Sequence, residues 1–219
     1  MNRELVLPEP RKSGLKGNEL VRKLYHISAG GLAFLLRYLS WHQTLILAVV
    51  SILLNVLVVP FVGGRRWFWR ANERTQGYSH GILLYTGSVL VLVLVFHDAP
   101  WMTAAIWGVL AFGDGMSGIV GQAFGGRRLP WNAKKSWAGS IAFVVFGGVA
   151  AAVLLLWTAD PALGLNVGRA CLLGFLLALV CGAVESLPSR LDDNVTIPLA
   201  GAISLPLLTF FLPLSQSAS

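Results

Sequence analysis

The sequence predicts an all-α membrane protein, a polytopic helical bundle of about seven transmembrane helices. Two observations support this prediction. Of the 219 residues, 55% are hydrophobic and only 12% are charged, which is about half the charged fraction of an ordinary soluble domain. The hydrophobic residues also gather into windows of about 17 to 25 residues, the length at which a helix crosses a hydrocarbon core.

Seven apolar windows follow one another along the chain. They cover about residues 24–40, 43–62, 80–97, 100–123, 138–157, 168–186 and 195–213. His26 and Arg37 interrupt the first window, and Tyr85 and Gly87 interrupt the third, so these two are the weakest. No Ala-x-Ala-like site follows the first window, and we expect no cleavable signal peptide. Residues 1–17, rich in Pro, Lys, Arg and Gly, predict a basic cytoplasmic tail before a single transmembrane domain over 18–219.

The distribution of Lys and Arg predicts the orientation. If the N-terminus is cytoplasmic, all of the 17 Lys and Arg except Arg37 and Arg169 fall on the cytoplasmic side, as short cytoplasmic loops require. The C-terminus then lies on the opposite side. Topology and anionic headgroups of membrane lipids therefore explain the net charge of +7, and we expect no nucleic-acid partner. Cys171 and Cys181 lie too far apart along one helix to pair, and we interpret them as packing residues.

Few polar residues interrupt the windows, and most of them fall at the predicted cytoplasmic ends. Asp114 is the most informative, because a charged carboxylate inside a span costs a few kcal/mol and usually faces a bundle interior or a site. We predict a functional role for Asp114. The alternative is a helix-interface residue that hydrogen-bonds a neighbour. The remaining candidates are His26, Glu185, Asp192, Asp193, Asn194 and the cations between residues 127 and 135.

The segment after Asp114 combines glycines with cations. Small residues at 113, 115, 118 and 121 indicate close helix packing. Gly125-Gly126, directly before Arg127-Arg128, predicts a tight turn that exposes backbone N–H groups. Lys134-Lys135-Ser136 then precedes the fifth window. Backbone donors, cations and a helix start are what a polyphosphate needs, although lysines of this kind also occur in any cytoplasmic loop.

A second polar cluster, ESLPSRLDDN over residues 185–194, separates the last two windows. Its carboxylates and asparagine are oxygen ligands of the kind that a hard cation bridging to phosphate prefers. The simpler alternative is that Asp192-Asp193-Asn194 caps the last helix. Capping and metal binding are compatible.

Four stretches together carry a resemblance to a known family. They are RKLYH (22–26), GDGMSGIVGQAFG (113–125), KKSWAGS (134–140), and ES (185–186) followed by DDNVTIPL (192–199). In this order the set resembles the polyprenol kinases: dolichol kinases, phytol kinases and CTP-dependent diacylglycerol kinases. The resemblance covers most of the chain from residue 22 onward.

The resemblance implies an integral membrane kinase with its active site on the cytoplasmic side. It would move the γ-phosphate of CTP to the hydroxyl of a lipid alcohol (a polyprenol, dolichol, phytol, geranylgeraniol or diacylglycerol) with Mg²⁺ or Mn²⁺. Asp114 and Asp193 would act as metal ligands or as the base, Glu185 and Asp192 as further ligands, and Lys135 as a catalytic cation. The nucleotide would contact Gly125, Gly126, Arg127, Lys134, Lys135, Ser136 and Gly139. Residues that bind substrate or support the site would be Arg22, Lys23, His26 and Asn194.

Other functions are weighed against the kinase. The middle motif also resembles that of phosphatidate cytidylyltransferases, but the chain has DDNVTIPLAG where those enzymes close on a His-Gly-Gly and paired-aspartate signature. A transporter would place charges at mid-membrane and facing both sides, and a scaffold would not need carboxylates opposite lysines. One departure from the kinases is Ala138, where many relatives carry a glutamate whose task would fall here to Glu185 or Asp192. The sequence does not determine an oligomeric state.

Overall fold

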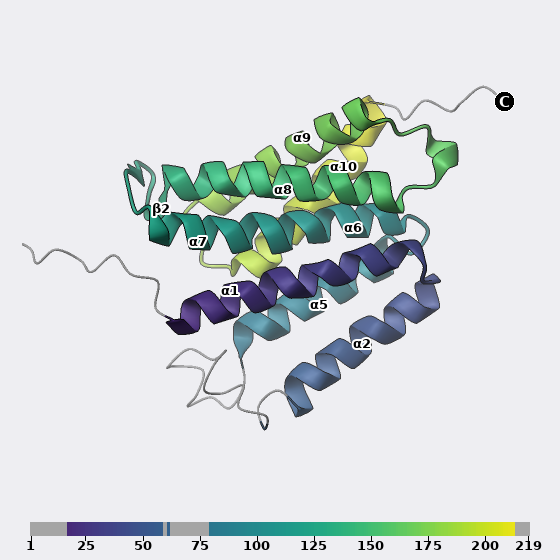
Figure 1. Cartoon of the computed structure of the whole chain (residues 1–219), viewed down its shortest axis with the longest axis horizontal. Helices are drawn as coiled ribbons and strands as arrows, with labels where there is room; N and C mark the ends of the chain where they lie inside the picture. Colours follow the sequence, from purple (N-terminus) through teal and green to yellow (C-terminus); the bar gives the residue numbers. More distant parts are fainter. Residues whose placement is uncertain (1–16, 59–60, 62–78, 213–219) are drawn as a thin grey trace, which may run out of the picture.

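The helices of the computed structural model lie side by side in a bundle (Figure 1). The structure describes residues 17–58, 61 and 79–212. Within these ranges the helical elements are α1 (Gly17–Gly30) with the 3₁₀ continuation η1 (Gly31–Arg37), α2 (Trp41–Leu57), α5 (His80–Val95), α6 (Pro100–Gly108), the π-helical η3 (Val109–Asp114), α7 (Gly115–Ala123), α8 (Trp137–Thr158), the 3₁₀ turn η4 (Pro161–Leu163), α9 (Val167–Ser186) and α10 (Asp193–Phe211).

Four of the described helical stretches are long and apolar enough to cross a membrane. They are Pro100–Ala123, Trp137–Thr158, Val167–Ser186 and Asp193–Phe211, and they match the last four predicted windows. Trp41–Leu57 and His80–Val95 are shorter apolar helices. The first window is divided between α1 and η1, so seven spans remain a prediction. The basic segment between the second and third windows lies outside the described residues.

Small residues allow the central helices to pack closely. A Cβ at Gly174 of α9 would lie 2.7 Å from two backbone atoms of α8, and a Cβ at Gly115 would lie 2.4 Å from Ile27 of α1. At Gly118, an added Cβ would lie 2.6 Å from the Lys23 side chain. The close packing predicted for the glycines between 113 and 121 is therefore confirmed. It brings α1 against α7 where the polar motifs lie.

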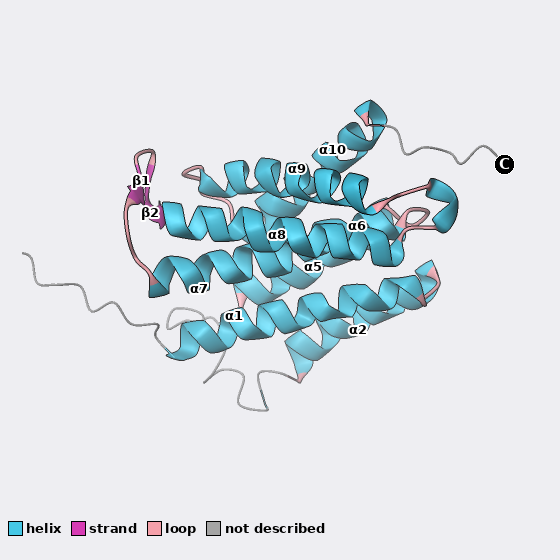
Figure 2. Cartoon of the chain, turned by 45° about the horizontal axis from the view of Figure 1, so that its top comes forward, coloured by secondary structure: helices cyan, strands magenta, loops and turns pink. Residues whose placement is uncertain are grey.

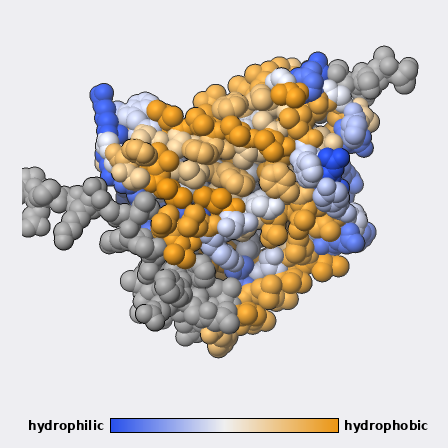
Figure 3. Space-filling view, viewed as in Figure 1, coloured by the Kyte–Doolittle hydropathy of each residue, from blue (hydrophilic) through white to orange (hydrophobic). Residues whose placement is uncertain are grey.

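Apolar side chains cover much of the outer surface between the two ends of the bundle. Figure 3 shows this surface over the helices on one face, with hydrophilic residues gathered mainly at the ends. Large exposed side chains include Val149 and Val153 of α8, Leu179 of α9 and Ile203 of α10. Exposed apolar area on this scale is typical of a surface that faces lipid. The fold is that of a helical membrane protein.

The prediction of an all-helical chain misses one small element. Strands β1 (Arg128–Leu129) and β2 (Asn132–Ser136) form an antiparallel hairpin between α7 and α8 (Figure 2). Gly125 and Gly126 precede it with φ values of +54° and +66°, a left-handed conformation that favours glycine. The hairpin is attached to α9, because the Asn132 side chain donates to the Ser186 carbonyl at 3.0 Å.

The two ends of the bundle give a direct test of orientation. The hairpin lies at one end, and η4, which connects α8 to α9, lies at the other (Figure 1). We expect a membrane-impermeant thiol reagent added from outside to label a cysteine at Asp160 and not one at Gly126. The measurement should use a Cys171→Ser background, because Cys171 is exposed and Cys181 is buried. External labelling at Gly126 would contradict a cytoplasmic site.

Candidate active site

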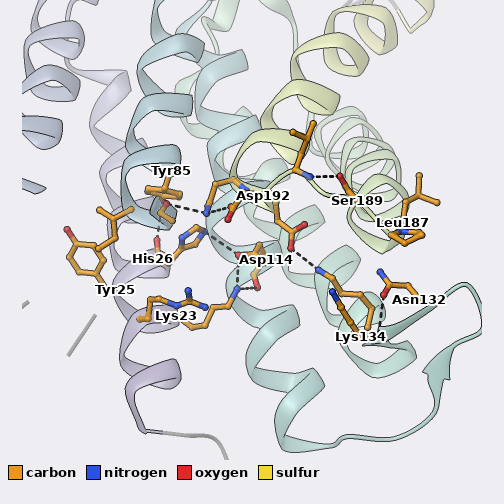
Figure 4. A pocket seen from close by; sticks show the side chains of 18 residues that line it. Lys23, Tyr25, His26, Tyr85, Asp114, Asn132, Lys134, Leu187, Ser189 and Asp192 are labelled. Carbon is orange, nitrogen blue, oxygen red and sulfur yellow. Dashed lines mark hydrogen bonds and ion pairs between the residues drawn. The ribbon is translucent and has the colours of Figure 1, made fainter. Parts of the chain in front are cut away.

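Two adjoining cavities lie at the hairpin end of the bundle, with volumes of about 320 Å³ and 710 Å³. They share one group of charged lining residues: Arg22, Lys23, Asp114, Lys134, Lys135 and Asp193. Figure 4 shows side chains from several helices and the hairpin converging on the smaller cavity. The structure therefore brings together motifs that are up to about 170 residues apart in the sequence.

Asp114 is held at the end of the π-helical segment η3. A π-helical turn contains an extra residue relative to an α-helical turn, and such turns are frequent at functional sites. The buried carboxylate accepts a hydrogen bond from Lys23 Nζ at 2.7 Å and lies 3.7 Å from His26 Nε2. Lys23 also donates to the Asp114 carbonyl. This arrangement keeps a charged carboxylate inside an apolar helix by pairing it with a cation.

Three carboxylates from three elements meet beside the cavities. Asp114 ends η3, Glu185 lies in the last turn of α9, and Asp193 begins α10. One oxygen from each lies within 4.8 Å of the other two. Like charges at such separations repel, so the cluster requires cations to stabilise it.

Lys135 of β2 supplies one of these cations. Its Nζ donates to Glu185 Oε1 and to Asp193 Oδ2, the second contact at 2.9 Å. Burial lowers the pKa of Lys135, but the neighbouring Glu185 and Asp193 carboxylates outweigh burial and raise that pKa above its usual value. Lys135 is therefore charged throughout the physiological pH range.

The donor set fits a divalent cation. Glu185 Oε2 is buried and lacks a hydrogen-bond partner among the described residues, and an unsatisfied buried carboxylate oxygen is costly. Carboxylate oxygens are the ligands that Mg²⁺ and Mn²⁺ prefer. Asp114, Glu185 and Asp193 are thus the residues that would hold such an ion.

The larger cavity has features that suit phosphate groups. The N-terminal turn of the 22-residue α8 contributes Ser136, Gly139 and Ser140 to its wall. Ser136 caps this helix, since its Oγ accepts from the Gly139 N–H at 3.2 Å. Helix N-termini favour anions, and Lys134 and Lys135 line the same cavity. A Cβ at Gly139 would lie 3.0 Å from the Ser117 carbonyl oxygen, so this glycine permits the close crossing of α7 and α8.

The remaining predicted nucleotide and substrate residues also have defined places. Gly125 and Gly126 line the larger cavity, whereas His26, Asp192 and Asn194 line the smaller one. Arg127 lines neither cavity, and the neighbouring Arg128 lines the larger one. The sequence pattern singled out Arg127, whereas Arg128 is the arginine that lines the cavity.

Asp192 is predicted as a fourth metal ligand, but it has another structural role. It is the N-cap of α10, and its Oδ1 accepts from the backbone and side-chain N–H groups of Asn194 at 2.9 Å and 2.7 Å. It does not belong to the cluster formed by the other three carboxylates. The structure therefore shows Asp192 as the cap of α10, outside the cluster of Asp114, Glu185 and Asp193.

Sequence reasoning did not identify Tyr25, Tyr85 or Asn132 as residues of this region. All three line the smaller cavity. Tyr25 lies within the RKLYH motif, and Tyr85 interrupts an apolar window. The sequence therefore gave a weak indication that each of them belongs to the site. Asn132 had none, because its role depends on the hairpin that positions it against Ser186.

The fold and site define a helical membrane protein with an acidic, lysine-lined pocket at one end of its bundle. The chain is 32% identical over 213 residues to probable phytol kinase 3 of Glycine max, covering 90% of this chain and 66% of that protein. It is 31% identical over 206 residues to farnesol kinase of Arabidopsis thaliana (88% and 66%) and to probable phytol kinase 2 of Glycine max (89% and 67%). The chain belongs to the polyprenol kinase family.

The chain spans about two thirds of the length of these relatives, which are described as chloroplastic. No family model matches the chain, and no solved structure matches it.

Proposed function

We propose that this protein is an integral membrane kinase that transfers the γ-phosphate of CTP to the hydroxyl of an isoprenoid alcohol. The observation that carries the proposal is the three-carboxylate cluster of Asp114, Glu185 and Asp193, which lies with Lys135 beside two adjoining cavities. One cavity would take the polyphosphate and the other the alcohol. The similarity to phytol and farnesol kinases supports this class of acceptor.

In this reaction the alcohol oxygen bonds to the γ-phosphorus, and the bond from that phosphorus to the β–γ bridging oxygen breaks, which leaves CDP. Catalysis of phosphoryl transfer is chiefly positioning and charge neutralisation. Mg²⁺ held by Asp114, Glu185 and Asp193 would neutralise charge on the transferred phosphoryl group. Lys134 and Lys135 would bind the triphosphate, and the N-terminus of α8 would orient it.

The proposed reaction also requires that Asp114 stays ionised and that a base accepts the proton of the alcohol. Lys23 pairs with Asp114 and would keep that carboxylate ionised before the nucleotide enters. Asp193 lines both cavities, and its oxygen that does not contact Lys135 would accept the proton of the alcohol. The cluster lies at the hairpin end, which the distribution of Lys and Arg predicts to be the cytoplasmic side, where the nucleotide would be.

Label transfer tests the reaction. Purified protein given CTP labelled at the γ position and farnesol or phytol should transfer the label to extractable lipid and release CDP. ATP in place of CTP should give a lower kcat/KM. The alternative, a cytidylyltransferase, would release pyrophosphate and leave cytidine on a lipid phosphate. Label that stays in the aqueous phase as pyrophosphate would contradict the kinase.

Excess EDTA should abolish this transfer, and added Mg²⁺ or Mn²⁺ should restore it. Polyphosphate transfer without charge neutralisation is unfavourable. Full turnover in excess chelator would refute the proposed metal set while leaving the kinase activity established.

A further inference from the structure

A third cavity lies between α1, α2 and α5, separate from the charged residues. Its volume is about 80 Å³, and its wall is mainly apolar. On α2 it is lined by Leu47 and Ala48, and on α5 by Val89 and Val93. Ala29 of α1 and Leu32 and Leu36 of η1 complete the apolar lining. We call this cavity the apolar groove.

The apolar groove shares two lining tyrosines with the candidate active site. Tyr25 and Tyr85 line both the groove and the 320 Å³ cavity. The Tyr85 ring lies 4.1 Å, centroid to centroid, from the His26 ring, and His26 Nε2 lies 3.7 Å from Asp114 Oδ2. The His26 side chain therefore lies between Tyr85, at the end of the groove, and Asp114 of the carboxylate cluster.

Polar groups along the apolar groove hydrogen-bond within the protein. Tyr25 donates to Asn55 Oδ1 at 2.8 Å, and Trp107 Nε1 donates to the Tyr85 hydroxyl at 2.6 Å. The hydroxyls of Thr44 and Thr86 donate to carbonyls of their own helices or caps. With most of the polar lining groups satisfied in this way, the wall suits hydrocarbon better than water.

The helix arrangement gives the apolar groove its length and direction. α2 packs against α5 and makes little contact with α1, and Figure 1 shows these three helices together along one side of the bundle. Between Val93 and Tyr85 the groove follows α5 for about 12 Å at 1.5 Å of rise per residue. Exposed Leu53 and Leu54 on α2 show that this helix also has a lipid-facing side.

We propose that the apolar groove holds the hydrocarbon chain of the isoprenoid acceptor, with the hydroxyl passing Tyr25 and Tyr85 toward Asp114. This inference rests on the proposed kinase function, and it assigns the part of the protein that recognises the acceptor. The groove is narrow, at about 80 Å³, and shares Tyr25 and Tyr85 with the polar cavity, so it fits part of a single chain better than the two acyl chains of diacylglycerol.

A substitution that fills the apolar groove should change acceptor selectivity. Ala48 is 8% exposed and lines the groove, whereas Val50 on the same helix is 42% exposed and does not. We expect Ala48→Phe to lower the ratio of kcat/KM for farnesol to kcat/KM for prenol, which has one isoprene unit, by about tenfold or more, the range that steric changes in apolar pockets produce. Val50→Phe should leave the ratio unchanged.

An unchanged ratio in Ala48→Phe would overturn the groove assignment. Absence of phosphorylation of both alcohols by the unsubstituted protein would instead overturn the proposed function, so the two failures are distinguishable.

Photocrosslinking provides a test that does not need turnover or a stable variant. A farnesol analogue with a diazirine at its distal end, added to unsubstituted protein in vesicles, should label peptides from η1, α2 or α5. Excess unlabelled farnesol should prevent this labelling. Labelling confined to α8 or α9 would overturn the proposal. So would labelling of the groove that persists in excess unlabelled farnesol, which would indicate a bulk lipid site.

Discussion

Replacing Asp114 by Asn is expected to lower the rate of phosphoryl transfer by at least about a hundredfold, on the order of 3 kcal/mol in the activation barrier. The substitution keeps the size of the side chain and most of its hydrogen-bonding capacity while removing its charge. Asp114 is one of three clustered carboxylates and pairs with Lys23 at 2.7 Å. The loss would therefore report electrostatics, measured as kcat for farnesol at saturating CTP and Mg²⁺.

Asp98→Asn is the matched control for this experiment. Asp98 lies in the turn between α5 and α6, its side chain is 88% exposed, and it does not line the cavities of the candidate site. The control variant should retain normal turnover. If Asp114→Asn inserts, folds and turns over normally, Asp114 would be a packing residue and the proposed metal set would be wrong.

Replacing Lys135 by Ala is expected to affect both catalysis and stability. The nucleotide KM should rise and kcat should fall, because the charge would contact phosphate before and during transfer; we expect kcat/KM for CTP to fall by about a hundredfold or more. The substitution also leaves Glu185, whose side chain is only 2% exposed, without its cation. Breaking a buried pair in this way costs up to about 3 kcal/mol, measurable as a lower thermal unfolding temperature in detergent.

A double variant tests the stability effect of Lys135 by itself. Lys135→Met with Glu185→Gln removes both charges, so no buried carboxylate is left unpaired. We expect it to recover thermal stability relative to Lys135→Ala while remaining inactive. Recovery of activity together with stability would show that phosphoryl transfer needs neither the Lys135 cation nor the Glu185 carboxylate. An unchanged KM for CTP in Lys135→Ala would contradict phosphate binding.

Much of the fold could be predicted because lipid imposes a strong constraint on sequence. A helix that crosses a bilayer needs a long apolar run, and the four stretches from Pro100 to Phe211 that meet this requirement coincide with predicted windows. The first window was harder to interpret, since His26 and Arg37 interrupt it. Of its polar residues, His26 lies beside Asp114 at the candidate site. Arg37 lies at the opposite end of the bundle, where it donates to the Trp157 carbonyl.

The candidate site was predictable in its residue types and less so in its pairings. Asp114, Glu185 and Asp193 stood out because carboxylates are rare next to apolar runs, and the structure gathers these three. Asp192 follows the same pattern, yet it caps α10. Adjacent aspartates at a helix start point in different directions, and only the packing of α10 against the bundle decides which one reaches the cluster.

The sequence by itself determined the membrane class, the family and the set of polar residues that a site can use, because composition, window length and motif order are properties of the linear chain. The tertiary structure decided the pairing of Lys23 with Asp114, the bridge from Lys135 to Glu185 and Asp193, and the apolar groove. The two sets of ion pairs depend on how closely α1, α7, α9 and α10 approach one another, and the groove depends on how α1, α2 and α5 pack. That approach is set by contacts between distant glycines and side chains, such as Gly118 with Lys23, which no local pattern specifies.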